Sequence, residues 1–485
     1  MRYYIRNQIL DLLPTIWDGV KYARKANTDV QSAGTMLSDC FSALETVGQV
    51  LESNLSARRF EFYSCIIADL KEMLEGINSP NTAQKFKEQL KYLKRALQSE
   101  EEVKLEVLFL PYKFSMWDSM ESIWKAASED PRCDCYVMPV PYYERGSNNN
   151  NEFCYEGGQF PEDVRVTHYS EYGIDARRPD IIYIHNPYDA NNKVTMVAEP
   201  YHSHNLKQYT DMLVYVPYFI AGGYLSVEQA SLKCVTSGAA NSSRVIVQSE
   251  VLRDIYIKCG FSPKKIIALG SPKIDAVLKN IRNPKPLPQE WGKKINGNRV
   301  ILLNSSIGKL LKDPAYILKL KENISTIMNK KGITLIWRPH PLLEATIKSI
   351  RPDFLSGYCD IKNMILASAN SILDENGDSS FAVTASDAMI SDGSSLIRTY
   401  IMTEKPILVI ESSSEAKHWA LLSSDIYSCY FYNDGTTVDK FLDMVLSGED
   451  PLRKERIGNY KKSLINVDGS CGEKIHKYII GEVLR

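Results

Sequence analysis

A short run of small and polar residues, Ser391-Asp-Gly-Ser-Ser395, lies between two apolar stretches in the C-terminal half of the chain. The pattern predicts a strand, a tight turn and the start of a helix. The free N–H groups and the positive dipole end of a helix start suit a phosphate. An ordinary N-cap on a core helix fits the same residues. We therefore predict that Asp392, Gly393, Ser394 and Ser395 contact a phosphate-bearing ligand, with helix capping as the alternative.

A second polar segment, Trp337-Arg-Pro-His-Pro341, follows an apolar run that is typical of a central strand. Arg338 offers a planar fork of N–H donors for phosphate oxygens. His340 can protonate or hydrogen-bond a leaving phosphate near neutral pH. The two prolines favour an extended loop that would fix both side chains. A purely structural role at the end of the strand is the alternative for this pair.

Two further segments are expected near the same edge. Asn304, Ser305 and Ser306 follow an apolar run and offer an amide, hydroxyls and loop N–H groups. They do not form a P-loop, because the glycine and lysine spacing of that motif is absent. Lys273 follows the last strand predicted in the first half of the chain. We expect these four residues to contribute to binding the same ligand.

A base that activates a hydroxyl acceptor should come from the opposite side of the site, in the first half of the chain. His185 follows the apolar run 180–184, and Asp118 lies in the polar segment after the first predicted strand. A carboxylate or an imidazole within reach of a hydroxyl can act as a general base. For each residue, a buried hydrogen-bonded role is an equally good interpretation.

The apolar periodicity divides the chain into three parts. Residues 1–98 show helical spacing and predict a bundle that docks on the next domain or on a second subunit. Beyond residue 103, short apolar runs alternate with helical stretches, which is typical of parallel, doubly wound sheets. The Pro-rich segment 283–288 separates two such sheets. A ligand site is expected in the cleft between the carboxyl ends of their strands. The strands are expected at 103–111, 135–142, 180–186, 212–218, 244–248, 265–270, 299–304, 333–337, 388–391, 406–410 and 429–432.

Composition limits the partners. The 485 residues include 58 Lys and Arg against 59 Asp and Glu, so no global field recruits nucleic acid. Neither a signal peptide nor a run of about 18 apolar residues is present in the sequence, which predicts a cytoplasmic protein. The ten cysteines are scattered and predict reduced thiols and no metal site. A peripheral membrane contact stays open, although the polar faces of the N-terminal helices mix acidic and basic residues.

The ordered set of segments at 270–275, 301–306, 337–341 and 388–395, followed by Lys405-Pro406, resembles the CDP-glycerol glycerophosphotransferase family. That family includes the teichoic acid primases and polymerases of bacterial cell-wall synthesis. The resemblance covers roughly residues 240–450. It implies an α/β fold of the GT-B type, with two Rossmann-like doubly wound domains facing a cleft. We expect a helical domain at 1–99, an acceptor-side domain at 100–285 and a donor-binding domain at 286–485.

The resemblance also implies an activity. By position, His340 matches the family's Arg-x-His-Pro, a site for the donor pyrophosphate and the leaving CMP. Ser394 and Ser395 match its Asp-Tyr-Ser-Ser, with Gly393 in place of the aromatic residue. The family would transfer glycerol phosphate, or a related alditol phosphate, from a CDP-activated donor to a hydroxyl of a polymer or glycolipid acceptor. The resemblance implies no further cofactor. A polymer or glycolipid acceptor would place the protein in the cytoplasm at the inner face of the cell membrane.

One departure keeps alternatives open. The family's Trp-His-Gly-Thr-Pro is replaced here by the stretch 213–219, which contains no histidine. Either His185 substitutes for the missing base, or the acceptor and the chemistry differ. The alternatives are another GT-B enzyme, such as a UDP-sugar glycosyltransferase or a 2-epimerase, and a catalytically silent GT-B module that binds a nucleotide. The helical residues 1–99 could form a homo-oligomer contact in any of these cases.

Overall fold

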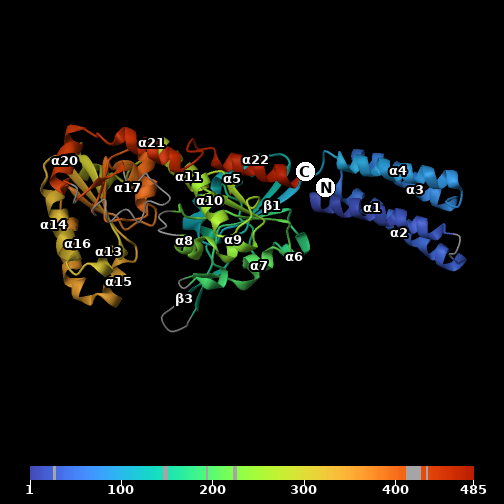
Figure 1. Ribbon diagram of the computed structural model, residues 1–485, viewed down its shortest axis with the longest axis horizontal. Coiled ribbons are helices and arrows are strands. Elements are labelled where there is room, and N and C mark those ends of the chain that lie inside the picture. The colour runs from blue at the N-terminus through green and yellow to red at the C-terminus, as the bar shows by residue number, and fades with distance from the viewer. Residues whose placement is uncertain are drawn as a thin grey trace.

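The computed structural model describes residues 1–25, 29–145, 151–192, 195–221, 227–410, 428–432 and 435–484. The described parts form an elongated molecule with a helical bundle at one end and two α/β regions beyond it (Figure 1). None of the helices within these ranges is both long and apolar enough to cross a bilayer.

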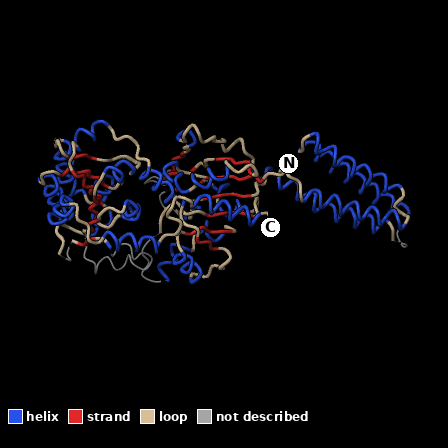
Figure 2. Tube along the Cα trace, turned by 90° about the horizontal axis from the view of Figure 1, so that it is seen from above, coloured by secondary structure: helices blue, strands red, loops and turns tan. Residues whose placement is uncertain are grey.

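The first 98 residues form a bundle of four helices, as the sequence predicts. Each helix buries one apolar stripe, and these stripes share a core that includes Leu44, Tyr63, Phe86 and Leu93. Both views show the bundle extending away from the sheets (Figures 1 and 2). Its helices are α1 (Tyr3–Ala23), α2 (Val30–Asn54), α3 (Ala57–Glu75) and α4 (Pro80–Gln98).

The first sheet is parallel and has the strand order β2-β1-β5-β7-β8-β9. The chain adds β2 on one side of β1 and the later strands on the other side, so the topological switch point lies between β1 and β5. The strands are β1 (Leu105–Leu110), β2 (Cys133–Val137), β5 (Ile181–Ile184), β7 (Met212–Tyr215), β8 (Arg244–Val247) and β9 (Ile266–Ala268).

One predicted strand of this region is divided in two. The run 135–142 was expected to be continuous, but β2 ends at Val137 and β3 (Tyr142–Arg145) begins a separate antiparallel sheet of order β4-β3-β6. Pro139 and Pro141 lie between the two strands, and each lacks the N–H that a continuing ladder needs. The other two strands of the small sheet are β4 (Asn151–Cys154) and β6 (Thr195–Val197).

Short helices connect the strands of the first sheet. Those that matter for the site are η1 (Phe114–Ser119) after β1, and α11 (Pro272–Arg282), which leads to the second sheet. The remainder are α5 (Glu121–Ser128), η2 (Gly157–Gln159), α6 (Ile174–Arg177), η3 (Asp189–Asn191), η4 (Glu199–Tyr201), α7 (Ser203–Leu206), α8 (Val227–Cys234), α9 (Ser237–Asn241) and α10 (Glu250–Lys258).

The second sheet repeats the same plan with the order β12-β11-β10-β13-β14-β15, all parallel. Its switch point lies between β10 and β13. The edge strand β12 was not predicted. The strands are β10 (Arg299–Ser305), β11 (Ile333–Pro339), β12 (Ser371–Leu373), β13 (Ala388–Ser391), β14 (Ile407–Val409) and β15 (Tyr430–Phe431).

Helices cover both faces of the second sheet, and each face has its own apolar core. Helices α14, α16 and α20 pack on one face, while α17, α18 and α21 pack on the other. The elements are α12 (Gln289–Ile295), α13 (Ile307–Lys312), α14 (Tyr316–Asn329), α15 (Leu343–Ile350), η5 (Pro352–Phe354), α16 (Leu355–Leu366), α17 (Ser380–Ala385), α18 (Leu396–Tyr400), η6 (Ile401–Thr403), α20 (Val438–Ser447) and α21 (Arg453–Ser463).

The last helix, α22 (Cys471–Val483), returns to the first sheet (Figure 1). Its residues Ile475 and Ile479 are fully buried in the core beside β1 and β5. The buried carboxylate of Asp275 accepts hydrogen bonds from the first two N–H groups of α22, at 3.1 and 2.8 Å. The C-terminal segment therefore ties the two α/β regions together, while the expected domain boundaries remain predictions.

Candidate functional site

A cavity of about 430 Å³ opens at the carboxyl edge of the second sheet, beside its switch point. Three residues that the sequence predicted as ligand contacts line it, namely Asn304, Ser305 and Asp392. The other lining residues come from the ends of β10, β14 and β15 and from α13 and α14: Leu303, Lys309, Asp313, Tyr316, Lys319, Leu320, Glu322, Asn323, Ile410 and Tyr432. Open α/β sheets bind their ligands in this kind of crevice.

Asp392 holds the wall of this cavity together. Both carboxylate oxygens accept a hydrogen bond from the N–H of Ser306, each at 2.9 Å, and one also accepts from the hydroxyl of Tyr316 at 3.0 Å. Burial raises the pKa of Asp392 above that of an ordinary carboxyl group. These contacts make Asp392 a positioning residue that fixes the turn between β10 and α13.

The turn after Asp392 is built from the predicted small residues. Gly393 has a φ of +101°, a conformation that favours glycine. The N–H of Ser394 donates to Ser391 Oγ at 3.2 Å, and Ser394 Oγ accepts from the N–H of Leu396 at 3.1 Å. The predicted helix follows as α18, but it has only five residues, so the dipole at its N-terminus is weak. Ser395 is exposed at its start.

Arg338 lies at the end of β11, where the sequence placed it, but its guanidinium is nearly buried. Its Nη1 donates to Asp374 Oδ2 at 2.5 Å, and Nη2 donates to the carbonyl of Gly377 at 3.2 Å. The side chains of Arg338 and Asp374 are 8% and 1% exposed. Asn304 Nδ2 also donates to the carbonyl of Arg338 at 3.0 Å. The Arg338 guanidinium, which is predicted to bind phosphate, therefore binds the Asp374 carboxylate. Together with its contact to Gly377, this fixes the loop after β12.

His340 is the exposed member of the same segment. The backbone N–H of His340 donates to the carbonyl of Ser305 at 2.9 Å. Its ring Nδ1 accepts from the backbone N–H of Leu342 at 3.1 Å. Partial burial lowers the pKa of His340, so the ring is neutral near pH 7. Since Nδ1 accepts, the proton lies on Nε2, which has no partner among the described residues. His340 can thus donate to a ligand at the mouth of the cleft.

His185 lies at the switch point of the first sheet and is completely buried. Its Nε2 accepts from the N–H of Tyr112 at 3.1 Å, and its Nδ1 lies 3.0 Å from the hydroxyl of Ser119. Burial lowers the pKa of His185 to about 3, with a smaller contribution from the positive charge of Lys273. Both ring nitrogens have partners and neither reaches solvent, so this position lacks the accessible nitrogen that a general base needs.

Asp118 and Lys273, two residues predicted separately, are in contact. Lys273 Nζ donates to Asp118 Oδ2 at 2.5 Å, which joins η1 to the first turn of α11. Asp118 Oδ1 is buried and has no hydrogen-bond partner among the described residues. Burial raises the pKa of Asp118, Lys273 opposes this rise, and the negative charge of Asp378 in the second α/β region adds to it. Asp118 therefore senses a charge of the second α/β region, and one of its oxygens has no partner among the described residues.

Two residues of the site gave no usable signal in the sequence. Tyr316 has the spacing of a core residue in α14, and its hydroxyl reaches Asp392 across 76 positions. Asp374 follows a strand that was itself not predicted, and it meets Arg338 across 36 positions. Such pairings depend on how the strands are ordered in the sheet, which local patterns do not specify.

Comparisons with known proteins agree on the fold. No protein-family model matches the chain, and no curated protein matches it. Among solved structures, a putative UDP-N-acetylglucosamine 2-epimerase from Listeria monocytogenes is 14% identical, with a TM-score of 0.54 over 78% of this chain and 96% of that one. The UDP-GlcNAc 2-epimerase from Methanocaldococcus jannaschii is 12% identical, with a TM-score of 0.51 over 78% of this chain and 100% of that one.

The wall teichoic acid polymerase TagF is 14% identical, with a TM-score of 0.50, and the match covers 87% of this chain and 98% of that one. At these identities the similarity concerns the fold alone. The two parallel sheets and these neighbours together show that the chain has a GT-B fold preceded by a helical bundle, as the sequence predicts.

Proposed function

We propose that this chain is a GT-B transferase that takes a CDP-activated alditol phosphate, such as CDP-glycerol, as its donor. The acceptor is a hydroxyl of a cell-wall polymer or glycolipid at the inner face of the cell membrane, and CMP is released. The observation that carries the proposal is the cavity of about 430 Å³ at the second switch point, lined by Asn304, Ser305 and Asp392.

The lining of the cavity suits a nucleotide with phosphate groups. Lys309 and Lys319 supply positive charge, and Tyr432 supplies an aromatic face. Lys319 is paired with Asp313 at 2.9 Å, and Lys309 adds a second cation to the cavity wall. A pocket of this size with a few polar groups is typical of small-molecule sites.

The proposed chemistry assigns one role to each side of the cleft. The carboxylate of Asp118, whose side chain is 30% exposed, takes the proton of the acceptor hydroxyl, and Lys273 holds this carboxylate in place. The acceptor oxygen then attacks the phosphorus of the alditol phosphate, and the bond from that phosphorus to the bridging oxygen of CMP breaks. His340 donates from Nε2 to the departing phosphate, which leaves with the negative charge. Of the two bases that the sequence predicts, His185 and Asp118, only Asp118 remains our candidate.

A ligand panel tests this proposal. Thermal unfolding of the full chain is measured with CDP-glycerol, CDP-ribitol, CMP, UDP-GlcNAc and UDP. A ligand at about 100 times its dissociation constant stabilises a protein by roughly 2.7 kcal/mol. We expect a rise in Tm with the cytidine ligands only. A response to uridine ligands alone would favour a UDP-sugar enzyme, and no response to any ligand would contradict a nucleotide site.

A variant pair locates the ligand. Lys309→Ala removes a cation from the cavity wall, whereas Lys312→Ala removes an exposed cation from the same helix outside the cavity. A hydrogen bond to a charged group contributes about 1.5–3 kcal/mol, so Lys309→Ala should weaken CDP-glycerol binding by at least tenfold. Equal affinities of the two variants would place the ligand elsewhere.

A further inference from the structure

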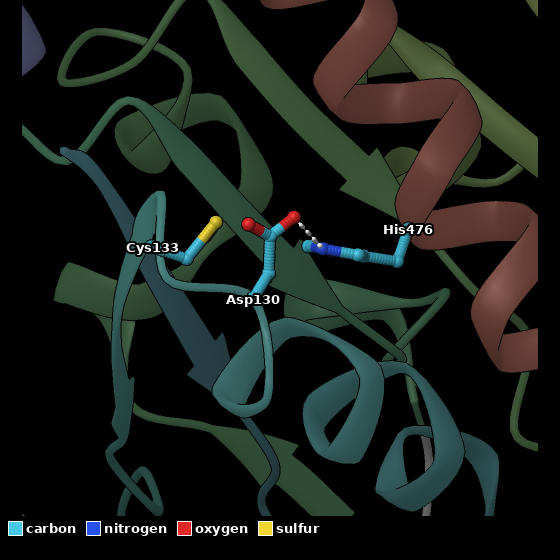
Figure 3. A group of neighbouring side chains, drawn as sticks. All are labelled: Asp130, Cys133 and His476. Atoms are coloured by element: carbon cyan, nitrogen blue, oxygen red, sulfur yellow. Dashed lines mark hydrogen bonds and ion pairs between the residues drawn. The ribbon is translucent and has the colours of Figure 1, made fainter. Parts of the chain in front are cut away.

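A second cluster of reactive side chains lies at the amino end of the first sheet, opposite the edge that carries Asp118. Asp130 lies in the loop before β2, Cys133 begins β2, and His476 comes from α22. One ligand atom from each residue lies within 4.8 Å of the other two. Figure 3 shows the thiol and the imidazole on either side of the Asp130 carboxylate.

The spacing of these atoms is close to that of a metal site. Asp130 Oδ2 and His476 Nε2 are 3.0 Å apart. Two ligands at about 2.0–2.2 Å from a tetrahedral ion are about 3.3 Å apart, and a thiolate sulfur binds at about 2.3 Å. The carboxylate and the imidazole would therefore separate by only a few tenths of an ångström to admit an ion, and the thiol would close on it from the strand.

The cluster is largely buried, and one of its polar atoms is unsatisfied. Cys133 and His476 are 7% and 6% exposed, and His476 Nδ1 is buried without a hydrogen-bond partner. Arg132 donates to both oxygens of Asp130, at 3.0 and 2.7 Å. Such outer contacts orient the carboxylates that bind metals. The side chain of Asp130 remains 10% exposed, which leaves one side of the cluster open to solvent.

We infer that Asp130, Cys133 and His476 bind a divalent transition-metal ion, with zinc as the best match, and that the ion clamps α22 to the first sheet. One sulfur, one nitrogen and one oxygen ligand suit zinc, with water in the fourth position. As the sulfur–zinc bond forms, the Cys133 thiol releases its proton to solvent. The inference is independent of the proposed function, because the cluster is remote from the cleft.

The clamp would act on the segment that joins the two α/β regions. Helix α22 follows α21 of the second region and packs against α5 of the first. Apart from apolar packing, the contact between His476 and Asp130 is a direct polar link from α22 to the loop after α5. A bound ion would turn this single hydrogen bond into three metal–ligand bonds.

Cobalt titration of the full chain, freed of metal with a chelator, tests the inference. We expect one Co²⁺ per chain, with the absorption band of a cobalt–thiolate bond, and displacement by Zn²⁺. Cys133→Ser should abolish the band and weaken Co²⁺ binding at least tenfold, since even outer contacts of metal sites contribute about 10–100-fold. Cys135→Ser, in the same strand, is the matched control and should keep the band.

Two results would overturn the inference. One is the absence of saturable Co²⁺ binding to the wild-type chain, and the other is a band that survives Cys133→Ser or is lost in Cys135→Ser. Thermal unfolding gives a second readout. Zinc should raise the Tm of the wild type and of Cys135→Ser, but not that of His476→Gln. If His476→Gln lowers the Tm while zinc leaves the wild type unchanged, the cluster is a hydrogen-bonded contact only.

Discussion

The two parallel sheets share one topology but differ at their carboxyl edges. At the switch point of the first sheet, the cavity beside Tyr112 and Asn186 measures about 10 Å³, which is room for about one water molecule. At the switch point of the second sheet, the cavity measures about 430 Å³. One edge is filled by protein, and the other is open to a ligand.

The residues that follow the strands explain the difference. In the first sheet, β1 and β5 continue into Tyr112 and His185, whose rings pack edge to face with centroids 5.3 Å apart. In the second sheet, β10 and β13 continue into the small residues Ser306, Asp392 and Gly393, and the backbone N–H of Ser306 donates to the Asp392 carboxylate. The topology provides a switch point in both sheets, and side-chain size decides whether it opens.

The largest loss of turnover is expected from a change at Asp118, the residue at the carboxyl edge of the first sheet that acts as the base in the proposed reaction. Asp118→Asn removes the base while keeping the shape of the side chain, and general-base catalysis contributes about 10²–10⁴-fold. Turnover of CDP-glycerol with an acceptor should fall by that factor. Burial raises the pKa of Asp118, so the carboxylate is protonated at a higher pH than an ordinary carboxylate. As the pH is lowered, the wild-type kcat/KM should therefore begin to fall at a correspondingly higher pH.

The matched control for that variant is Glu121→Gln, which changes a neighbouring acid that pairs with Lys279 on the surface. It should leave turnover nearly unchanged. If Asp118→Asn retains full turnover, the carboxyl edge of the first sheet supplies no base. The two edges would then differ in packing but not in a catalytic role.

The open edge depends on a buried ion pair, and breaking that pair should have the next largest effect. Arg338→Ala leaves the carboxylate of Asp374 buried without its partner, which costs about 3–5 kcal/mol in comparable cases. Urea unfolding should show this loss, and adding Asp374→Asn should recover part of it. Arg351→Ala, which breaks the more exposed pair with Asp353, should cost at most about 1 kcal/mol. Equal losses would mean that the Arg338 pair is not buried.

The smallest expected effect is a pH dependence of the free energy of unfolding. It tests how completely His185 is buried at the carboxyl edge of the first sheet. His185 has a pKa of about 3 when folded and an ordinary value of 6.5 when unfolded. Between these values the unfolded chain binds one more proton, so the free energy of unfolding falls as the pH falls, by up to about 1.4 kcal/mol per pH unit.

Urea unfolding at pH 6.5, 5.5 and 4.5 should therefore give a steeper loss in the wild type than in His185→Gln, which does not titrate. Other groups titrate in this range, so the difference between the two proteins is the quantity to compare. Identical pH dependences would indicate that His185 can be protonated in the folded state, and the first edge would then be more open than its packing indicates.

The sequence by itself determined the elements and the location of the candidate site. Apolar periodicity distinguished the N-terminal helices from the two sheets, because burial of one helix face or of both faces of a strand leaves a local pattern. Polar residues directly after apolar runs marked the carboxyl edges, and Asn304, Ser305 and Asp392 do line one cavity. The division between β2 and β3 was also readable, from Pro139 and Pro141, although the run was predicted as one strand.

The tertiary structure alone decided what each of these residues contacts. Arg338, which the sequence predicts to bind phosphate, pairs with Asp374, while His185 is enclosed by Tyr112 and Ser119. Asp130 meets His476 across 346 positions. Hydrogen bonds and ion pairs between residues so far apart depend on strand order and helix packing, and those are settled by the whole core rather than by any local run of residues.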